Sequence, residues 1–163
     1  MFREMRRSGQ QMSKEKTEAI LEKCSSGVLC LSGDGGYPYG VPLNYVFADG
    51  KIYFHCAVIG HKTDAIEKNN KASFTVLETD VIAPPMCSSF YRSVIAFGTV
   101  SFIQDEAAQK EALVMMIDKY SNDKTGSLAE VDLMLPRTSV FVFDVEFVTG
   151  KESSEFAAAH PRK

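Results

Sequence analysis

The sequence lacks several features that would place it in a common functional class. No run of apolar residues approaches the length needed to span a bilayer. The charged N-terminal residues 1–7 have no apolar segment behind them, so they do not form a secretory signal. The formal net charge of −3 leaves no basic excess of the kind that nucleic-acid-binding proteins present. We therefore expect a soluble, cytoplasmic protein that binds neither a membrane nor a nucleic acid.

Motifs for metal binding and for nucleophilic catalysis are also missing. The four cysteines form no Cys-x-x-Cys pair and no cluster with histidine, so the sequence predicts no structural zinc site. His55, His61 and His160 lack the spacing of a metal-binding helix or a facial triad. No Ser/His/Asp or Cys/His arrangement stands out. A hydrolase or a metalloenzyme is therefore disfavoured, and in a reducing cytosol the cysteines are most simply small core or strand residues.

The chain does contain enough apolar residues for one core. It has 163 residues, of which 45% are hydrophobic and 24% are charged, and these values are typical of a single globular domain. We expect one domain over residues 1–163, with the body of the fold at about 13–152 and flexible ends. The tail 153–163 is predicted to be frayed.

Turn signals and hydrophobic periodicity predict a mainly β protein. Asp49-Gly50 between two apolar runs indicates a hairpin, Gly98 suggests a bulge in a long strand, and Pro84-Pro85 predicts a loop. The expected strands are 27–32, 39–47, 51–57, 71–77, 91–103 and 139–148, the expected helices are 13–24, 62–69 and 105–120, and 121–137 is expected to be a loop with a helical turn. Strands 39–47 and 51–57 have no crossover helix between them, which disfavours a doubly wound fold. About six hairpin-linked strands favour a closed or split antiparallel β-barrel with helices on its outside.

The segment Gly60-His61-Lys62 is a candidate anion site at the start of a helix. A helix N-terminus offers free amides and a partial positive charge, and Lys62 could add a charge-assisted hydrogen bond to a phosphate. A turn with its side chains in solvent would have the same sequence. On this segment alone, that ordinary interpretation is preferred.

Three further sets of residues have both a functional and an ordinary interpretation. The strand with Val41, Pro42, Leu43, Asn44 and Tyr45 must be unpaired on one side near Pro42, so its backbone could bind a flat heterocycle, or it could be a plain edge strand. His55 lies mid-strand, where a histidine is more often structural, although a ligand held at residues 60–62 would be within its reach. Arg92 and Ser93 could bind a phosphate or make local surface bonds.

In their order along the chain, these segments resemble a known family. The blocks that carry the resemblance are Gly36-x-Pro-x-x-Val-Pro-Leu-Asn-Tyr, Asp49-Gly-Lys-Ile-Tyr-Phe-His-x-Ala-x-x-Gly-x-Lys, Tyr91-Arg-Ser-Val-Ile-x-Phe-Gly and Phe143-x-Val-x-x-Val-Thr-Gly-Lys. They resemble the FMN-binding split barrels related to pyridoxamine 5'-phosphate oxidase, and within these the nitroimidazole-resistance branch. The resemblance covers roughly residues 13–152, and its second block is the most specific.

The resemblance implies an antiparallel split β-barrel that forms a homodimer with two FMN molecules at the subunit interface. Val41, Pro42, Leu43, Asn44 and Tyr45 would line the isoalloxazine, largely through backbone. His61 and Lys62, after Gly60, would hold the phosphate, and Arg92 and Ser93 would complete the site. His55 matches a histidine that lies beside the flavin and the bound nitro compound or small acid. The implied activity is reduction of a small electrophile with FMN and a nicotinamide or other donor, in which His55 or a water supplies a proton.

The same resemblance leaves alternatives. The substrate-binding arginine and histidine of the vitamin B6 oxidases have no clear match after Gly150, so oxidation of that vitamin is not expected. A non-catalytic haem- or flavin-binding module on the same barrel, with His55 or His61 as a haem ligand, is the main alternative. A deazaflavin enzyme ranks last, because that cofactor's acidic tail would call for more basic residues.

Overall fold

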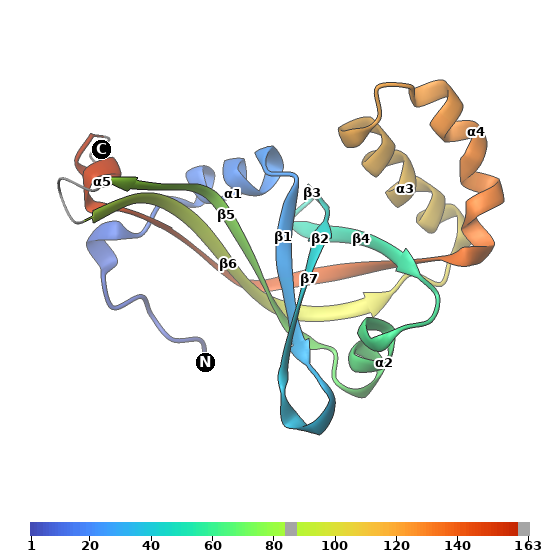
Figure 1. Ribbon diagram of the computed structural model, residues 1–163, viewed down its shortest axis with the longest axis horizontal. Coiled ribbons are helices and arrows are strands. Elements are labelled where there is room, and N and C mark those ends of the chain that lie inside the picture. Colours follow the sequence, from blue (N-terminus) through green and yellow to red (C-terminus); the bar gives the residue numbers. More distant parts are fainter. Residues whose placement is uncertain (84–87, 160–163) are drawn as a thin grey trace.

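The computed structural model describes residues 1–83 and 88–159 and shows a seven-stranded antiparallel sheet with helices around it (Figure 1). The strands are β1 (Ser26–Ser32), β2 (Pro38–Asn44), β3 (Val46–Ala48), β4 (Lys51–Ala57), β5 (Lys71–Ala83), β6 (Ser88–Phe102) and β7 (Thr138–Glu152). The α-helices are α1 (Lys14–Lys23), α2 (His61–Lys68), α3 (Glu106–Tyr120), α4 (Lys124–Met134) and α5 (Ser154–Ala159), and short 3-10 turns lie at Ser8–Gln10, Asp34–Gly36 and Leu135–Arg137. No helix among the described residues is long and apolar enough to cross a membrane.

The sheet closes because its two edge strands are consecutive in the chain. Its strand order is β2-β1-β5-β6-β7-β4-β3, and Tyr45 alone separates β2 from β3. One residue can link the two edges only if the sheet curls until they meet, which makes it a split barrel. The predicted strand 39–47 is therefore wrong as a single strand, because it divides at Tyr45 and its two parts pair with different neighbours. The predicted hairpin at Asp49-Gly50 is confirmed, and it joins β3 to β4.

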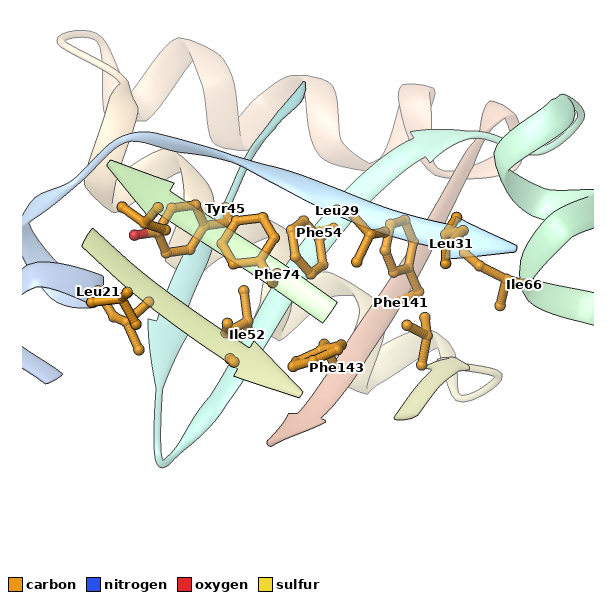
Figure 2. Close-up of a cluster of buried hydrophobic side chains, with 14 of the residues drawn as sticks. Leu21, Leu29, Leu31, Tyr45, Ile52, Phe54, Ile66, Phe74, Phe141 and Phe143 are labelled. Carbon is orange, nitrogen blue, oxygen red and sulfur yellow. The ribbon is translucent and has the colours of Figure 1, made fainter. Parts of the chain in front are cut away.

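The interior of the barrel is a cluster of aromatic rings with aliphatic side chains around it (Figure 2). The ring centroid of Phe54 lies 5.1 Å from that of Phe74 and 4.9 Å from that of Phe141, and Tyr45 lies 4.9 Å from Phe74. All four residues have no exposed surface. Each such aromatic pair adds about 0.5–1.5 kcal/mol beyond the burial of its area. This cluster fixes β4, the strand that carries His55, against β7.

Gly98 produces the bulge that the sequence predicts. The register between β6 and β7 shifts between Phe97 and Gly98. A Cβ at position 98 would clash with the backbone oxygen of Asp144 on β7, so only glycine allows the two strands to approach this closely.

Three predictions about element boundaries are wrong. Residues 124–134 form the regular helix α4, where a loop with one helical turn was expected. β5 and β7 continue well beyond residues 77 and 148, to Ala83 and Glu152. Residues 154–159 of the tail form α5, which packs on β6. The loop predicted at Pro84-Pro85 and the end of the tail at 160–163 lie outside the described residues.

Candidate functional site

β2 lies at an edge of the sheet, as its proline predicts. It pairs with β1 alone, in a register that places Pro42 opposite Val28. Val41 and Leu43 pack against the core, whereas Pro42 and Asn44 face outward. In the part of the chain that the structure describes, the other side of this strand has no partner strand, so its backbone groups are available to a ligand. The side chain of Tyr45 is not, because it is fully buried.

The break at Tyr45 is held by the end of α3. The hydroxyl of Tyr120 accepts a hydrogen bond from Tyr45 N at 3.1 Å and lies 2.5 Å from Tyr45 O, to which it can donate. Lys119 Nζ donates to Tyr45 O at 3.1 Å and to Cys24 O at 2.7 Å. These bonds satisfy the backbone N–H and C=O of Tyr45, which belongs to neither edge strand. They also tie α3 to the place where the barrel closes.

The helix α2 begins with open backbone donors. Its N-cap residue, Gly60, has φ of +154° and ψ of 169°, a conformation that favours glycine, and no side chain caps the helix. A Cβ built on Gly60 would meet nothing within 4 Å, so the space in front of the helix is open. Thr63 is buried and its hydroxyl donates to Gly60 O at 2.6 Å, which fixes the turn. The first-turn amides have no partner within the helix and point toward the open space.

His61 is held against the turn after β1. Its ring stacks on that of Tyr39 with centroids 4.1 Å apart, and its Nε2 lies 3.6 Å from Asp34 Oδ2. The other oxygen of Asp34 binds Lys68 Nζ at 2.8 Å, and this bond is the main cause of a lowered Asp34 pKa. The helix terminus and the edge strand β2 therefore meet through the contact of His61 with Tyr39.

His55 and Lys62 lie close together at the end of β4. The His55 residue keeps exposed surface, but partial desolvation of its ring lowers its pKa below the ordinary value of 6.5, and the positive charge of Lys62 lowers the pKa further. His55 Nδ1 lies 3.0 Å from the sulfur of Met116. A thioether can only accept a hydrogen bond, so this contact is favourable when Nδ1 carries the proton, which leaves Nε2 as the acceptor.

His55 also lines a pocket of about 340 Å³ between β4, β7 and the helices α3 and α4. The pocket is bounded by His55, Leu113, Met116, Ile117, Tyr120, Ser121, Ser127, Glu130, Val131, Met134 and Thr138. Figure 1 shows α3 and α4 as an antiparallel pair that rises beside the end of β4. The sequence analysis missed α4, which forms one wall of this pocket, because it assigned residues 121–137 to a loop with a helical turn. The apolar residues Leu128, Val131 and Met134 at helical spacing were the signal that could have found it.

Arg92 and Ser93 lie on opposite faces of β6 and away from Lys62. Arg92 and Phe102 are ten positions apart on β6, which corresponds to about 33 Å at the rise of a strand. Phe102 pairs with Phe141 of β7, which in turn pairs with Phe54 of β4, so Arg92 lies far from the end of β4 that leads to Lys62. The guanidinium packs over the ring of Phe156 in α5, 4.3 Å from its centroid. The structure thus brings His61 against β2 and Lys62 near His55, but places neither Arg92 nor Ser93 beside them within one chain.

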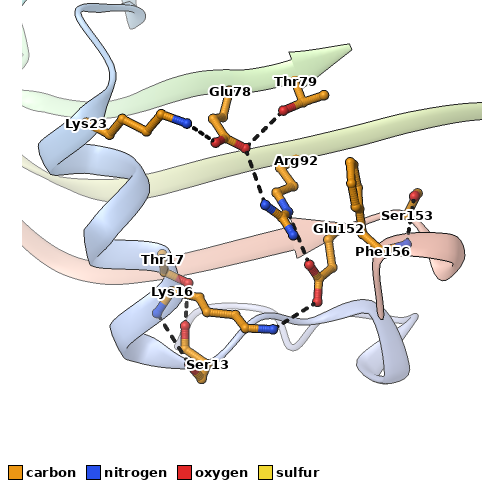
Figure 3. A network of polar contacts seen from close by, with 10 residues as sticks. All are labelled: Ser13, Lys16, Thr17, Lys23, Glu78, Thr79, Arg92, Glu152, Ser153 and Phe156. Carbon is orange, nitrogen blue, oxygen red and sulfur yellow. Dashed lines mark hydrogen bonds and ion pairs between the residues drawn. The ribbon is translucent and has the colours of Figure 1, made fainter. Parts of the chain in front are cut away.

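The guanidinium of Arg92 is held in a network of charges under α1 (Figure 3). Its Nε lies 3.3 Å from Glu152 Oε2, and its Nη1 lies 3.9 Å from Glu78 Oε2. Lys16 reaches the other oxygen of Glu152 at 3.7 Å, and Lys23 binds Glu78 at 2.8 Å. Glu152 is almost fully buried, so its charge depends on these partners. The arrangement is that of a structural ion network that joins α1 to the sheet.

The middle of the outer sheet face is uncharged across five strands, with Arg3 and Lys151 beside it. Two rows of cross-strand neighbours define it: Pro42, Val28, Thr75, Ile95 and Thr149 in one, and Gly40, Cys30, Ser73, Phe97 and Phe147 in the other. Ile95 and Phe97 are each 38% exposed. The stacked ring of Phe2, 5.0 Å from that of Phe147, covers one end of the face. Ser93 lines a hollow of about 220 Å³ beside it.

Among the described residues, no three His, Cys, Asp or Glu side chains gather as a metal ion would require. Cys24, Cys30 and Cys56 are free thiols, and each is partly buried. Burial raises the pKa of the Cys56 thiol above its ordinary value, although Lys62 lies near enough to oppose this shift. The groups gathered at the site are backbone amides, the ammonium group of Lys62, imidazole rings and the partly buried thiol of Cys56.

Solved structures with the same fold include flavoproteins. A candidate 5-nitroimidazole antibiotic resistance protein from Bacteroides thetaiotaomicron is 24% identical with a TM-score of 0.76, over 87% of this chain and 86% of its own. A flavocytochrome from Azotobacter vinelandii is 22% identical with a TM-score of 0.77, over 98% and 79%. An FAD-binding protein from Mesorhizobium loti is 22% identical with a TM-score of 0.64, over 89% and 98%. These likenesses confirm the predicted fold class, an antiparallel split β-barrel with peripheral helices.

The family comparison is more specific than the structural one. No match was found among curated proteins. The family described as pyridoxamine 5'-phosphate oxidase matches residues 13–152, which span the barrel from the N-cap of α1 to the end of β7. The chain therefore belongs to the pyridoxamine 5'-phosphate oxidase family.

Proposed function

We propose that the protein is a cytoplasmic FMN-dependent oxidoreductase that acts as a homodimer and reduces a small electrophile such as a nitroaromatic compound. The observation that carries this proposal is the junction of β4 and α2. There an uncapped helix N-terminus, the ammonium group of Lys62 and the imidazole of His55 lie near one another, and His61 contacts the edge strand β2, which has one open side.

The residues at the start of α2 suit a phosphate. Open space in front of Gly60 would admit it, and first-turn amides would donate to its oxygens. The charge of Lys62 would add a charge-assisted bond. Asp34 lies nearby, but its charge is balanced by Lys68. A dianion at this terminus is therefore favoured by the electrostatics of the site.

The edge strand β2 suits the polar rim of a flavin ring. The backbone of Val41, Pro42, Leu43 and Asn44 has one open side, and the buried ring of Tyr45 fixes the end of the strand. Tyr45 would contribute through its position and backbone rather than its side chain. When bound, FMN would supply the two-electron chemistry, with NAD(P)H as the electron source.

His55 would bind and orient the substrate. Its lowered pKa keeps the ring uncharged near neutral pH, so it can accept a hydrogen bond or take part in proton transfer. Its contact with Met116 fixes the ring at the mouth of the pocket beneath α3 and α4. The substrate would then lie between the cofactor site and this pocket.

The outer sheet face supports the homodimer. An exposed, uncharged patch over five strands is typical of an interface. Ser93 opens onto this face and could complete the cofactor site of a second copy, as the resemblance implies. Arg92 is turned away from it into the ion network, so we leave Arg92 out of the proposed site.

An absorbance spectrum of the purified protein tests the proposal. We expect flavin bands, or their appearance after FMN is added to a colourless preparation. Lys62→Ala should weaken FMN binding by about tenfold or more, since a charge-assisted hydrogen bond is lost. Lys71→Ala removes the same charge at the start of β5, three positions beyond the end of α2, and should change the affinity less than about twofold. A protein that takes up no FMN would refute the proposal.

A haem-binding module is the second candidate. His55 at the rim of an apolar pocket is a possible axial ligand, and the similar Azotobacter vinelandii protein is a flavocytochrome. Adding haemin and recording the Soret band of the native protein and of His55→Ala would separate the two candidates. A band that shifts in the variant would favour haem.

A further inference from the structure

We propose that the pocket between α3, α4 and His55 is the substrate pocket, and that it selects small aromatic molecules that are uncharged or cationic while excluding carboxylates and phosphate esters. This inference rests on the proposed function and names the substrate class of the same site. Three features of the pocket carry it: its size, its apolar walls and the sign of its charge.

The size of the pocket suits one ring with a substituent or a small pair of rings. Its volume is about 340 Å³, at the lower end of the range for ligand sites, roughly 300–1,000 Å³. An apolar cavity of about 150 Å³ is enough for benzene. A molecule with a sugar or a long tail would not fit inside.

The walls of the pocket are mainly hydrophobic. α3 contributes Leu113, Met116 and Ile117, and α4 contributes Val131 and Met134. The two methionine side chains are flexible and polarisable, and thioether sulfur makes favourable contacts with aromatic rings. A flat aromatic ring is therefore the chemistry that these walls bind best.

The only charged group that lines the pocket within the described residues, apart from the titratable His55, is the carboxylate of Glu130. Nearby lysines are engaged elsewhere: Lys119 binds backbone oxygens at the barrel closure, and Lys110 binds Glu106 and Asp132. Lys124 is likewise paired, with Asp118 at 2.6 Å. Lys62 lies near His55 but does not line the pocket, and the proposed function assigns it to the cofactor phosphate. An anion in this pocket would therefore be desolvated near Glu130 with no cation among the lining residues to compensate, which is costly.

Three nitrobenzenes that differ in the charge of one small substituent provide the test: nitrobenzene, 4-nitrobenzylammonium and 4-nitrobenzoate. Equilibrium dialysis against the purified full-length protein, with no electron donor present, measures binding without turnover. We expect 4-nitrobenzoate to bind at least tenfold more weakly than the other two. Equal binding of all three, or binding of none, would overturn the inference.

Two pairs of variants locate the binding. Glu130→Lys should remove the discrimination against 4-nitrobenzoate, whereas Glu111→Lys makes the same change in charge on the exposed side of α3 and should leave it intact. Val131→Trp should fill the pocket and weaken nitrobenzene binding about tenfold, whereas Leu133→Trp, at a position 73% exposed on the same helix, should not. Equal effects within either pair would place the ligand elsewhere.

The binding experiment also separates this inference from the proposed function. If FMN binds but the three ligands bind alike, the substrate pocket is wrong and the flavoprotein stands. If the ligands bind as expected but no FMN is taken up, the pocket stands and the cofactor is wrong. Circular dichroism of Val131→Trp checks its folding, and Glu130→Lys on the exposed rim gives an independent result.

Discussion

Arg92 shows how the role of a residue depends on the face of the strand it occupies. The sequence places it next to Ser93, and the two were expected to act together on a phosphate. In a strand, neighbours point to opposite faces, and Arg92 turns toward α1 and the carboxylate of Glu152 while Ser93 opens onto the outer sheet face. The alternation of the strand was visible in the sequence, but the buried partner of Arg92, 60 residues away, was not.

Loss of Arg92 should destabilise the protein. In Arg92→Ala, the buried carboxylate of Glu152 keeps only the long contact with Lys16, so we expect the free energy of unfolding to fall by about 2–4 kcal/mol. Urea denaturation measures this change. Arg137→Ala, which removes an exposed arginine, should lie within about 0.5 kcal/mol of the native protein. An Arg92→Ala protein of native stability that has lost FMN binding would instead support the phosphate role.

The lowered pKa of His55 should make the protein less stable in mild acid. The folded protein binds fewer protons at His55 than the unfolded chain, whose histidine titrates near 6.5. The stability that this ring contributes is therefore complete above about pH 6.5 and is lost as the pH falls from there toward the folded pKa. We expect the urea midpoint of the native protein to fall more between about pH 7.5 and 5.5 than that of His55→Gln. Parallel pH profiles for the two proteins would contradict this expectation.

At the scale of elements, the sequence predicts best where one segment carries its own signal. The Asp49-Gly50 hairpin and the bulge at Gly98 are local, and both are confirmed. α4 was missed because its apolar signal is short: Leu128, Val131 and Met134 recur at helical spacing, but none of its residues is buried and it packs mainly on α3. The division of strand 39–47 could not be seen either, because both parts are extended and only their pairing partners differ.

Gly98→Ala should destabilise the sheet. The added Cβ meets the backbone oxygen of Asp144, which β7 holds in place and which cannot move like a flexible side chain. We expect a loss of about 1–3 kcal/mol, as for overpacked cores, measured as a lower thermal or urea midpoint. Gly9→Ala, where a Cβ would meet nothing within 4 Å, serves as the control and should be close to neutral. A stable Gly98→Ala protein would mean that the bulge can relax.

At the scale of the whole molecule, the part of the candidate site that is contiguous in the sequence could be predicted. The part that is assembled from distant segments could not. His55, Gly60, His61 and Lys62 lie within eight positions of each other, so their order along the chain was enough to place them together. The pocket joins His55 to helices that begin at residues 106 and 124. Only the folded chain brings these helices into contact with His55, and no local sequence pattern indicates that contact.

A charge on the outer sheet face should break the proposed homodimer. Ile95 lies in the middle of the face, between Thr75 and Thr149, with 38% of its surface exposed. In a dimer that covers this face, glutamate at position 95 would be desolvated among apolar side chains, with only Arg3 and Lys151 of the neighbouring hollow to offset its charge, which is costly. We expect Ile95→Glu to sediment as a monomer in analytical ultracentrifugation at concentrations where the native protein is dimeric.

The same variant connects assembly to the cofactor. If FMN lies at the interface, Ile95→Glu should also bind it more weakly, although residue 95 is on the opposite strand face from the chain's own core and distant from Lys62. Leu133→Glu places the same charge at an exposed apolar residue of α4 and should affect neither assembly nor FMN affinity. A monomeric Ile95→Glu protein with native FMN affinity would show that one chain holds the cofactor alone, because the open edge of β2 and the start of α2 would then suffice without a second copy.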